Sequence, residues 1–293
     1  MTDEEQQRHD DDSPADPEER TEDAGDEADE HEPHRRMVSG YMREPGVHGP
    51  SRDHLARSAD VLTRLASEPR RAAILLDVDG ALAPIVPRPE DARVPHETQD
   101  ELRRLNDRYG LVACISGRAG CDAKQVVGVP ELVYVGNHGL ELEPEADAWA
   151  ARLADFLAET SWPRTEDKRL SAALHYRDVE DEQAALTRLE EVASAAQADG
   201  FRTRYGRKVL EILPPLDADK GTAVRRLLAD RQLERALYAG DDTTDIDAFH
   251  ALDGLEIAMR IAVASAEGPE QLRAAADLVV DGPAELLEVL RKL

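Results

Sequence analysis

The feature that most constrains the fold is an apolar run, Ala72 to Leu76, that ends in Asp77-Val78-Asp79-Gly80. A short apolar run of this kind predicts a buried strand of a parallel sheet. Side chains alternate along a strand, so Asp77 and Asp79 leave it on the same side. Two carboxylates so close repel each other, and a bound hard cation commonly offsets this repulsion. The alternative is an ordinary strand-to-turn junction with acids in the turn.

Strand-like and helix-like segments alternate on both sides of this run, which predicts a doubly wound, Rossmann-like α/β core with a parallel sheet. The expected helices of the core cover residues 54–66, 97–108, 119–127 and 219–230, with three more towards the C-terminus. The expected strands cover residues 72–76, 111–115, 132–135, 236–239, 255–259 and 278–280. Carboxyl ends of parallel strands meet at one edge, where such sheets bind ligands.

Between about residues 140 and 215 the pattern changes. Helices are expected over 148–159 and 181–198, a strand over 172–176, and a hairpin of 201–205 with 208–213. This reads as a small α+β insertion that ends at Pro214-Pro215. The expected organisation is therefore a disordered acidic tail over 1–50, a core domain over 51–139 and 214–293, and an inserted cap domain over 140–213.

Charge and cysteine content exclude several classes of function. The formal net charge is −26, about half of it in the first 32 residues, which argues against nucleic acid or an anionic membrane as a partner. No apolar stretch is long enough to span a membrane, and the N-terminus lacks the apolar core of a secretory signal. Cys114 and Cys121, the two cysteines, are expected as buried thiols in a reducing cytoplasm. The oligomeric state stays open, with a monomer as the working expectation.

Polar residues follow the expected strands at four points along the chain. These residues are Asp77 and Asp79, Ser116, Lys220 at a helix start, and the acids Asp241, Asp242 and Asp245. Acids, one hydroxyl and one lysine on a common edge suit phosphoryl transfer, since acids hold Mg²⁺ while lysine and serine bind phosphate oxygens. One acid must also attack phosphorus.

In this order the motifs resemble the haloacid dehalogenase superfamily and, within it, the trehalose-6-phosphate phosphatase family. The resemblance is carried by LDVDGALAPI (76–85), ISGR (115–118), GNHGLE (136–141), LSAALHYR (170–177), KVLEILPP (208–215), DKGTAV (219–224) and GDDTTDIDAF (240–249). Each motif alone is weak, but seven in order over residues 70–293 is a strong signal. The resemblance implies Mg²⁺-dependent hydrolysis of trehalose 6-phosphate, a small-molecule sugar phosphate, through an aspartyl-phosphate.

The resemblance also implies roles for individual residues. Asp77 would attack phosphorus, Asp79 would act as general acid and then base, and Ser116 and Lys220 would grip the phosphoryl group. The metal ligands would be Asp77, Asp79 through its backbone carbonyl, and Asp241, with Asp242 and Asp245 holding metal-bound water or orienting Lys220. The implied substrate-binding residues are Asp77, Val78, Asp79, Arg118, His138, Glu141, Arg177, Lys208 and Glu211. Arg118 either binds the ligand or neutralises neighbouring acids, and His175 is a further candidate of the cap.

One position departs from the family pattern, which has threonine after Asp-x-Asp-Gly where this chain has Ala81. We expect reduced or compensated activity, because a hydroxyl beside the phosphate site would be lost. Two alternatives to trehalose 6-phosphate hydrolysis follow. One is a phosphatase for another sugar phosphate, such as sucrose or mannosylglycerate phosphate; the other is a non-catalytic regulator that binds a sugar phosphate.

Overall fold

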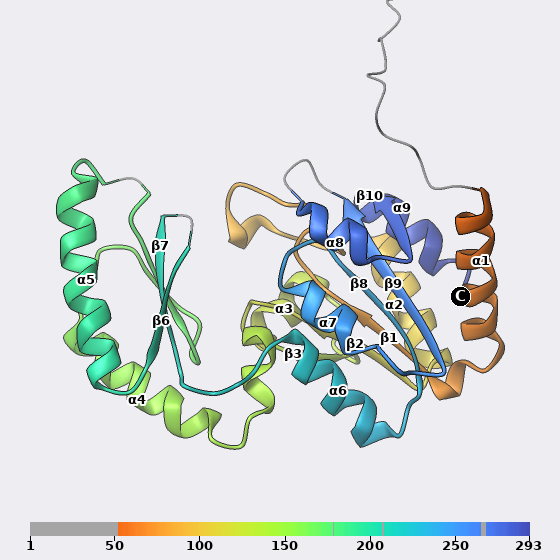
Figure 1. The fold of residues 1–293 in the computed structure, drawn as a ribbon, viewed down its shortest axis with the longest axis horizontal. Coiled ribbons are helices and arrows are strands. Elements are labelled where there is room, and N and C mark those ends of the chain that lie inside the picture. The colour runs from red at the N-terminus through yellow and green to blue at the C-terminus, as the bar shows by residue number, and fades with distance from the viewer. Residues whose placement is uncertain (1–51, 178, 207, 265–267) are drawn as a thin grey trace, which may run out of the picture. The chain divides into compact units, whose positions relative to one another are not determined.

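The computed structural model describes residues 52–177, 179–206, 208–264 and 268–293. The expected tail over 1–50 lies outside the described residues. Two sheets organise the described residues: a parallel sheet of six strands and an antiparallel sheet of four (Figure 1). No helix among the described residues is long and apolar enough to cross a bilayer.

The six-stranded sheet has the order β10-β9-β8-β1-β2-β3, and every neighbouring pair is parallel. Its strands are β1 (Ala72–Leu76), β2 (Leu111–Ile115), β3 (Val133–Val135), β8 (Arg235–Gly240), β9 (Ile257–Ala264) and β10 (Leu278–Asp281). The chain winds outward from β1 to β3 on one side and from β8 to β10 on the other. The order therefore reverses between β1 and β8, which is the point where doubly wound sheets bind ligands.

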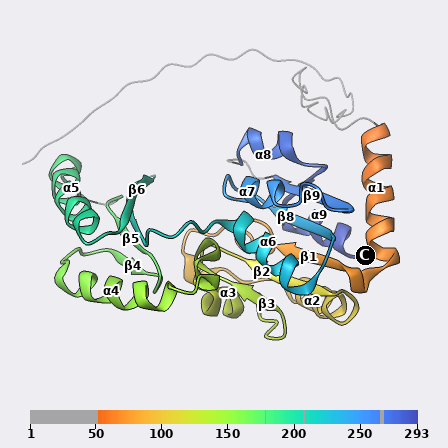
Figure 2. The ribbon, with the colours of Figure 1, turned by 60° about the horizontal axis from the view of Figure 1, so that its bottom comes forward.

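Helices cover both faces of this sheet (Figures 1 and 2). One face packs on α1 (Arg52–Ser67), α2 (His96–Arg108), α3 (Gly120–Val127) and α9 (Gly282–Leu290), and the other on α6 (Lys220–Arg231), α7 (Asp245–His250) and α8 (Glu270–Ala275). All five residues of β1 are buried, because the strand lies in the middle of the sheet between two helix layers. This burial on both faces explains why the sequence of β1 is apolar at every position.

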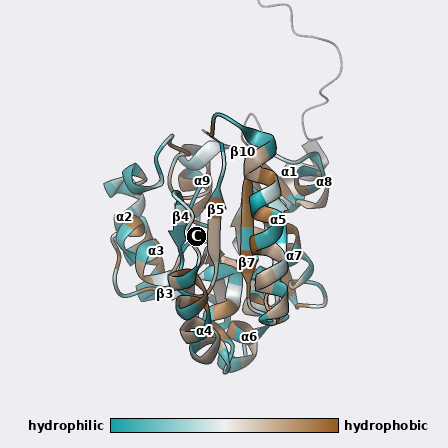
Figure 3. Cartoon of the chain, turned by 90° about the vertical axis from the view of Figure 1, so that its left-hand side faces the viewer, coloured by the Kyte–Doolittle hydropathy of each residue, from teal (hydrophilic) through white to brown (hydrophobic). Residues whose placement is uncertain are grey.

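The second sheet, with the order β4-β5-β7-β6, is antiparallel throughout. It consists of β4 (Thr165–Asp167), β5 (Ala172–His175), β6 (Arg202–Gly206) and β7 (Val209–Leu213), and we call this sheet with its two helices, α4 (Ala146–Glu159) and α5 (Glu182–Ala198), the cap. Both helices pack on one face of the sheet around Leu174, Leu210 and Ile212. In Figure 3, α5 carries both brown and teal stretches, as expected for a helix with one buried side.

Most expected elements occur, but several boundaries were wrong. Strand β4 was missed because all three of its residues are exposed and charged or polar, so it has no apolar alternation. Strand β9 begins two residues later than expected and runs on to Ala264. The expectation of two buried thiols was also wrong: Cys114 is buried in β2, where burial raises the pKa of its thiol, but Cys121 is exposed on α3.

Candidate active site

The turn after β1 places its two acids by a tight network of backbone hydrogen bonds. The Asp77 amide continues the sheet by donating to the Ala239 carbonyl at 2.8 Å. The chain then reverses, with the Val78 carbonyl accepting from the amides of Leu82 and Ala83 at 3.0 and 2.8 Å. Gly80 has a φ of +85°, which favours glycine. The acids therefore lie at the carboxyl end of the central strand.

Lys220 lies between two of the acids. Its ammonium donates to Asp77 Oδ1 at 2.6 Å and to Asp245 Oδ1 at 2.7 Å, and its side chain is 3% exposed. The lysine is the first residue of α6 because Asp219 caps that helix: its carboxylate accepts from the Thr222 amide at 2.6 Å, and the Thr222 hydroxyl accepts from the Asp219 amide at 2.9 Å. Burial alone would lower the pKa of Lys220, but Asp245 and Asp77 outweigh it and raise that pKa.

Asp245 organises the cluster without facing solvent. One of its oxygens accepts from Lys220 and from the Tyr238 hydroxyl, both at 2.7 Å. The other accepts from the amides of Asp241 and Asp242, both at 2.9 Å. All four donors bind the charged carboxylate, so Asp245 fixes the loop after β8 and the position of Lys220 together. The expectation that Asp245 orients Lys220 fits these contacts.

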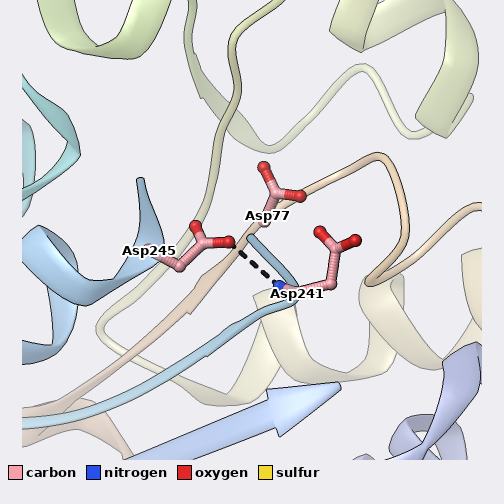
Figure 4. A group of neighbouring side chains, drawn as sticks. All are labelled: Asp77, Asp241 and Asp245. Carbon is pink, nitrogen blue, oxygen red and sulfur yellow. Dashed lines mark hydrogen bonds between the residues drawn. The ribbon is translucent and has the colours of Figure 1, made fainter. Parts of the chain in front are cut away.

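Asp241 comes from the end of β8 and lies beside Asp77 (Figure 4). Burial, together with neighbouring carboxylates, raises the pKa of Asp77 to about 7 and that of Asp241 to about 8. One oxygen from each of Asp77, Asp241 and Asp245 lies within 4.8 Å of the others. With all three acids ionised and one lysine beside them, the cluster carries three negative charges and one positive, a formal −2.

This cluster fits a hard divalent cation. Carboxylate oxygens are the ligands that Mg²⁺ and Ca²⁺ prefer, and a double positive charge would balance the formal excess. Gly80 leaves room for the Asp241 carboxylate, since a Cβ at position 80 would lie 2.0 Å from Asp241 Oδ2. Asp245 uses both oxygens for hydrogen bonds, which leaves Asp77 and Asp241 as the side chains with free oxygen capacity.

Gly80→Ala is expected to displace the Asp241 carboxylate and to weaken divalent-cation binding about tenfold to a hundredfold, since metal ligands tolerate little misplacement. Isothermal titration with Mg²⁺ measures the change. Gly254→Ala is the matched control, because Gly254 has almost the same φ, +86°, but no atom within 4 Å of an added Cβ. The control should share the backbone strain of about 1–2 kcal/mol and keep cation binding. Equal cation affinity in both variants would contradict the proposed contact.

Ser116 and Arg118 follow β2, the strand that pairs with β1 on the side opposite to β8. Arg118 binds Asp79 with two hydrogen bonds, Nε to Oδ2 at 2.6 Å and a terminal nitrogen to Oδ1 at 2.7 Å. Of the two roles left open for Arg118, the structure therefore places it against an acid. Ser116 is 1% exposed, and its hydroxyl accepts from the Arg118 amide at 3.1 Å.

His138 is held in a left-handed backbone conformation, with a φ of +54°. Its ring packs against Gly117, where an added Cβ would lie 2.7 Å from the ring. Burial lowers the pKa of His138 to about 4, so the ring is neutral near pH 7. Among the described residues its Nδ1 is the buried side-chain polar atom without a hydrogen-bond partner.

These groups share one cavity of about 600 Å³. Its lining includes eight residues that the sequence singled out, Asp77, Asp79, Ser116, Arg118, His138, Lys220, Asp241 and Asp242. It also includes Glu166 of β4 and Lys168, which the sequence analysis did not single out. Glu166 and Lys168 alternate in the segment Thr165–Lys168, just before the LSAALHYR motif. This alternation is the sequence feature that could have identified them as neighbours on one face of a strand.

Five other predicted substrate-binding residues do not line this cavity, and their roles stay predictions. The Val78 side chain is buried in the core. Glu141 accepts from the amides of Gly120 and Gly136 at 2.8 and 2.9 Å. Arg177 is exposed, and Lys208 pairs with Glu182 of the cap helix α5.

Glu211, the fifth, lies on the same face of the cap sheet as Glu166. The register pairs Glu166 with Ala173, Ala173 with Glu211, and Glu211 with Arg204, so these four residues form one row across the sheet. Arg204 binds Glu211 through Nε at 2.7 Å. This row lies on the face opposite the one that packs on α4 and α5, since Leu174 and Leu210 point to the helices. The row is therefore polar and begins at the cavity.

Comparison with known proteins gives the following similarities. The family model described as trehalose-phosphatase matches residues 75–283. A trehalose-phosphate phosphatase of Mycobacterium marinum is 35% identical over 217 residues, which are 65% of this chain and 54% of that protein. A Mycobacterium avium protein of the same name is 35% identical over 252 residues, 76% of this chain and 62% of that protein. The chain thus spans little more than half the length of these relatives.

A solved structure supports the fold. The C-terminal domain of a C. albicans trehalose-6-phosphate phosphatase superposes with a TM-score of 0.58 and 21% identity, covering 79% of this chain and 95% of that one.

Proposed function

Because the chain belongs to the trehalose-phosphatase family, we propose that it hydrolyses trehalose 6-phosphate to trehalose and phosphate. The observation that carries the proposal is the buried cluster of Asp77, Asp241, Asp245 and Lys220, which opens on a cavity also lined by the cap residues Glu166 and Lys168. The core side of this cavity has the groups for phosphoryl transfer. The cap side has polar groups that suit sugar hydroxyls.

Asp77 is the proposed nucleophile. Lys220 binds Asp77 Oδ1, which leaves the second carboxylate oxygen to form a bond with phosphorus while the bond to the sugar oxygen breaks. Lys220 and the Ser116 hydroxyl would bind the oxygens of the phosphoryl group. Water then attacks phosphorus, the bond to Asp77 breaks, and phosphate leaves with the aspartate regenerated.

Asp79 is the proposed proton donor and acceptor. It gives a proton to the departing sugar oxygen and later takes one from the attacking water. Both of its oxygens bind Arg118, so Asp79 reaches the sugar oxygen only after Arg118 releases it. The phosphate dianion of the substrate is a competing partner for that guanidinium.

Mg²⁺ is the proposed cofactor, held by the side chains of Asp77 and Asp241 and the backbone carbonyl of Asp79. When bound, it would neutralise charge on the phosphoryl oxygens and on the acids. Asp242 lines the cavity, and its carboxylate accepts from the Thr243 amide at 2.7 Å. It would bind metal-held water.

We propose the division of labour that the sequence suggested, a core over 51–139 and 214–293 and a cap over 140–213. Glu166 and Lys168 would contact the sugar directly. Glu211, which shares the polar row with Glu166, would contact the more distant glucose unit. This arrangement separates the chemical step on the core from sugar recognition on the cap.

Phosphate release from trehalose 6-phosphate, with Mg²⁺ and with a chelator in its place, tests the function. We expect turnover with Mg²⁺ and a loss of at least about a hundredfold without it. Sucrose 6-phosphate and mannosylglycerate phosphate serve as competing substrates in the same assay. A higher kcat/KM for either competitor would show that it, and not trehalose 6-phosphate, is the preferred substrate. Tight binding of trehalose 6-phosphate without phosphate release would indicate a regulator.

Ala81→Thr is expected to lower stability without raising turnover. Ala81 is fully buried in the large core cluster with Leu76 and Leu82 and does not line the cavity, so an added hydroxyl would enter an apolar site. We expect a cost of about 1–3 kcal/mol, measured by urea unfolding. Ala81→Val is the matched control, because valine has about the volume of threonine but no hydroxyl. A higher turnover in the Ala81→Thr variant than in the Ala81→Val variant would show that the hydroxyl reaches the phosphate after all.

A further inference from the structure

We propose that Asn137 is a positioning residue that holds the β4–β5 turn of the cap against the core and thereby sets where Lys168 stands in the cavity. The proposal rests on the proposed function, because it concerns how the sugar-binding side of that site is held in place.

The side-chain amide of Asn137 binds both ends of this turn. Its Nδ2 donates to the Lys168 carbonyl at 3.1 Å, and its Oδ1 accepts from the Ser171 hydroxyl at 2.9 Å. The turn itself is closed by the Lys168 amide, which donates to the Ser171 carbonyl at 2.9 Å. Asn137 is 1% exposed, so water does not compete for these bonds.

The loop that carries Asn137 has an uncommon backbone. Three consecutive residues have positive φ: Asn137 at 51°, His138 at 54° and Gly139 at 104°. Asparagine is among the side chains that tolerate this conformation best. Such backbone persists only where the surroundings hold it, and it concentrates at functional sites.

Backbone bonds tie this loop to the part of the core that would bind phosphate. The Asn137 amide donates to the Arg118 carbonyl at 2.8 Å, and the His138 amide donates to the Ser116 carbonyl at 2.9 Å. The Glu141 carboxylate adds two bonds, from the amides of Gly120 and Gly136. The cap turn is therefore connected through one side chain to the loop that carries Ser116.

A small apolar cluster supports the same junction. It contains Leu140 and Ala146, where the chain enters the cap, and Leu170 of the β4–β5 turn, and Leu216 packs on it where the chain returns to the core. Leu170 is 1% exposed and directly precedes Ser171. The Lys168 backbone is thus fixed to the core while its side chain lines the cavity.

Asn137→Gly tests the proposal without backbone strain, because glycine accepts positive φ. It removes the side-chain bonds to Lys168 and Ser171, together with the longer one to Glu141 at 3.4 Å. We expect the KM for trehalose 6-phosphate to rise about tenfold with kcat changed less than about threefold. Hydrolysis of p-nitrophenyl phosphate should stay unchanged, since this substrate has no sugar for the cap to bind. Asn137→Asp keeps the acceptor for Ser171 but turns a carboxylate oxygen towards the Lys168 carbonyl and the Glu141 carboxylate, so the KM should rise at least as much as in Asn137→Gly.

A double-mutant cycle separates positioning from general destabilisation. Lys168→Met alone should raise the KM for trehalose 6-phosphate, and adding Asn137→Gly to it should raise the KM little further, because both act on the same contact. Additive effects would overturn the proposal. So would an equal loss of kcat/KM for both substrates in Asn137→Gly, which would indicate a merely structural role.

A readout that needs no sugar phosphate keeps this inference distinct from the proposed function. Amide hydrogen exchange over residues 168–171 should be faster in Asn137→Gly than in the unaltered chain, and unchanged exchange would overturn the proposal. If the unaltered chain releases no phosphate from trehalose 6-phosphate, the proposed function fails, and the exchange result still decides whether Asn137 holds the turn.

Discussion

Asp77→Asn is expected to reduce phosphate release from trehalose 6-phosphate at least about a thousandfold, since removal of the nucleophile in other enzymes costs up to about a millionfold. An amide has the shape of the carboxylate but lacks the charge and the nucleophilic oxygen that the proposed aspartyl-phosphate requires. A stopped assay for inorganic phosphate with saturating Mg²⁺ measures the loss. Of all single changes considered, this one should affect activity most.

The stability of this variant supplies the control. Lys220 keeps its bond to Asp245 at 2.7 Å, and one of three crowded carboxylates loses its charge, so the melting temperature should not fall. The variant should also still be protected against thermal unfolding by trehalose 6-phosphate, which it binds but does not hydrolyse. Turnover near that of the unaltered chain, in a folded variant, would rule out Asp77 as nucleophile.

Lys220→Met is expected to have the largest effect on stability. It removes the ammonium that binds Asp77 and Asp245 and leaves the buried carboxylates without a positive neighbour. Breaking a buried ion pair by removing one partner costs about 3–5 kcal/mol. Urea unfolding in a chelator measures the loss, and Lys124→Met, at an exposed position on α3, is the matched control with an expected change below about 0.5 kcal/mol.

The loss in Lys220→Met should depend on pH. The pKa values of Asp77 and Asp241 are raised to about 7 and about 8, mainly by burial, and their neutral forms favour the folded state. A carboxyl with a raised folded pKa contributes stability at low pH that is lost as the pH rises through that pKa. The variant should therefore be nearer to the unaltered chain at pH 5 than at pH 8. A deficit independent of pH would mean that packing, not charge, explains the loss.

The elements that the sequence predicted well share one property, an apolar pattern that only one structure satisfies. The run Ala72–Leu76 is buried on both faces, and so it predicted the central strand and the edge where Asp77 lies. Asp241 could be assigned to the same edge because parallel strands end together. Strand spacing and sheet topology thus predicted at which edge of the sheet the acids lie, although they gave no side-chain contacts.

The contacts of the cap could not be predicted in the same way. Strand β4 has no apolar residue, so neither its existence nor the position of Glu166 follows from periodicity.

Two side-chain directions in the core could not be predicted either. The side chain of Ala81 points into the core because the turn from Val78 to Ala83 closes tightly, and the sequence alone does not give that direction. The partner of Arg118 was left open for the same reason: a guanidinium reaches several groups, and only the folded loop selects Asp79.

The position of β1 between β2 and β8 has a consequence for synthesis of the chain. A ribosome completes β1, β2 and β3 and the entire insertion before it adds Arg235–Gly240, so until then one side of the central strand has bare amides and carbonyls. The nascent core is consequently most exposed to faulty pairing with other chains while the insertion is being translated. The carboxylates of Asp77 and Asp241 come together only after residue 241 of the 293 has been added.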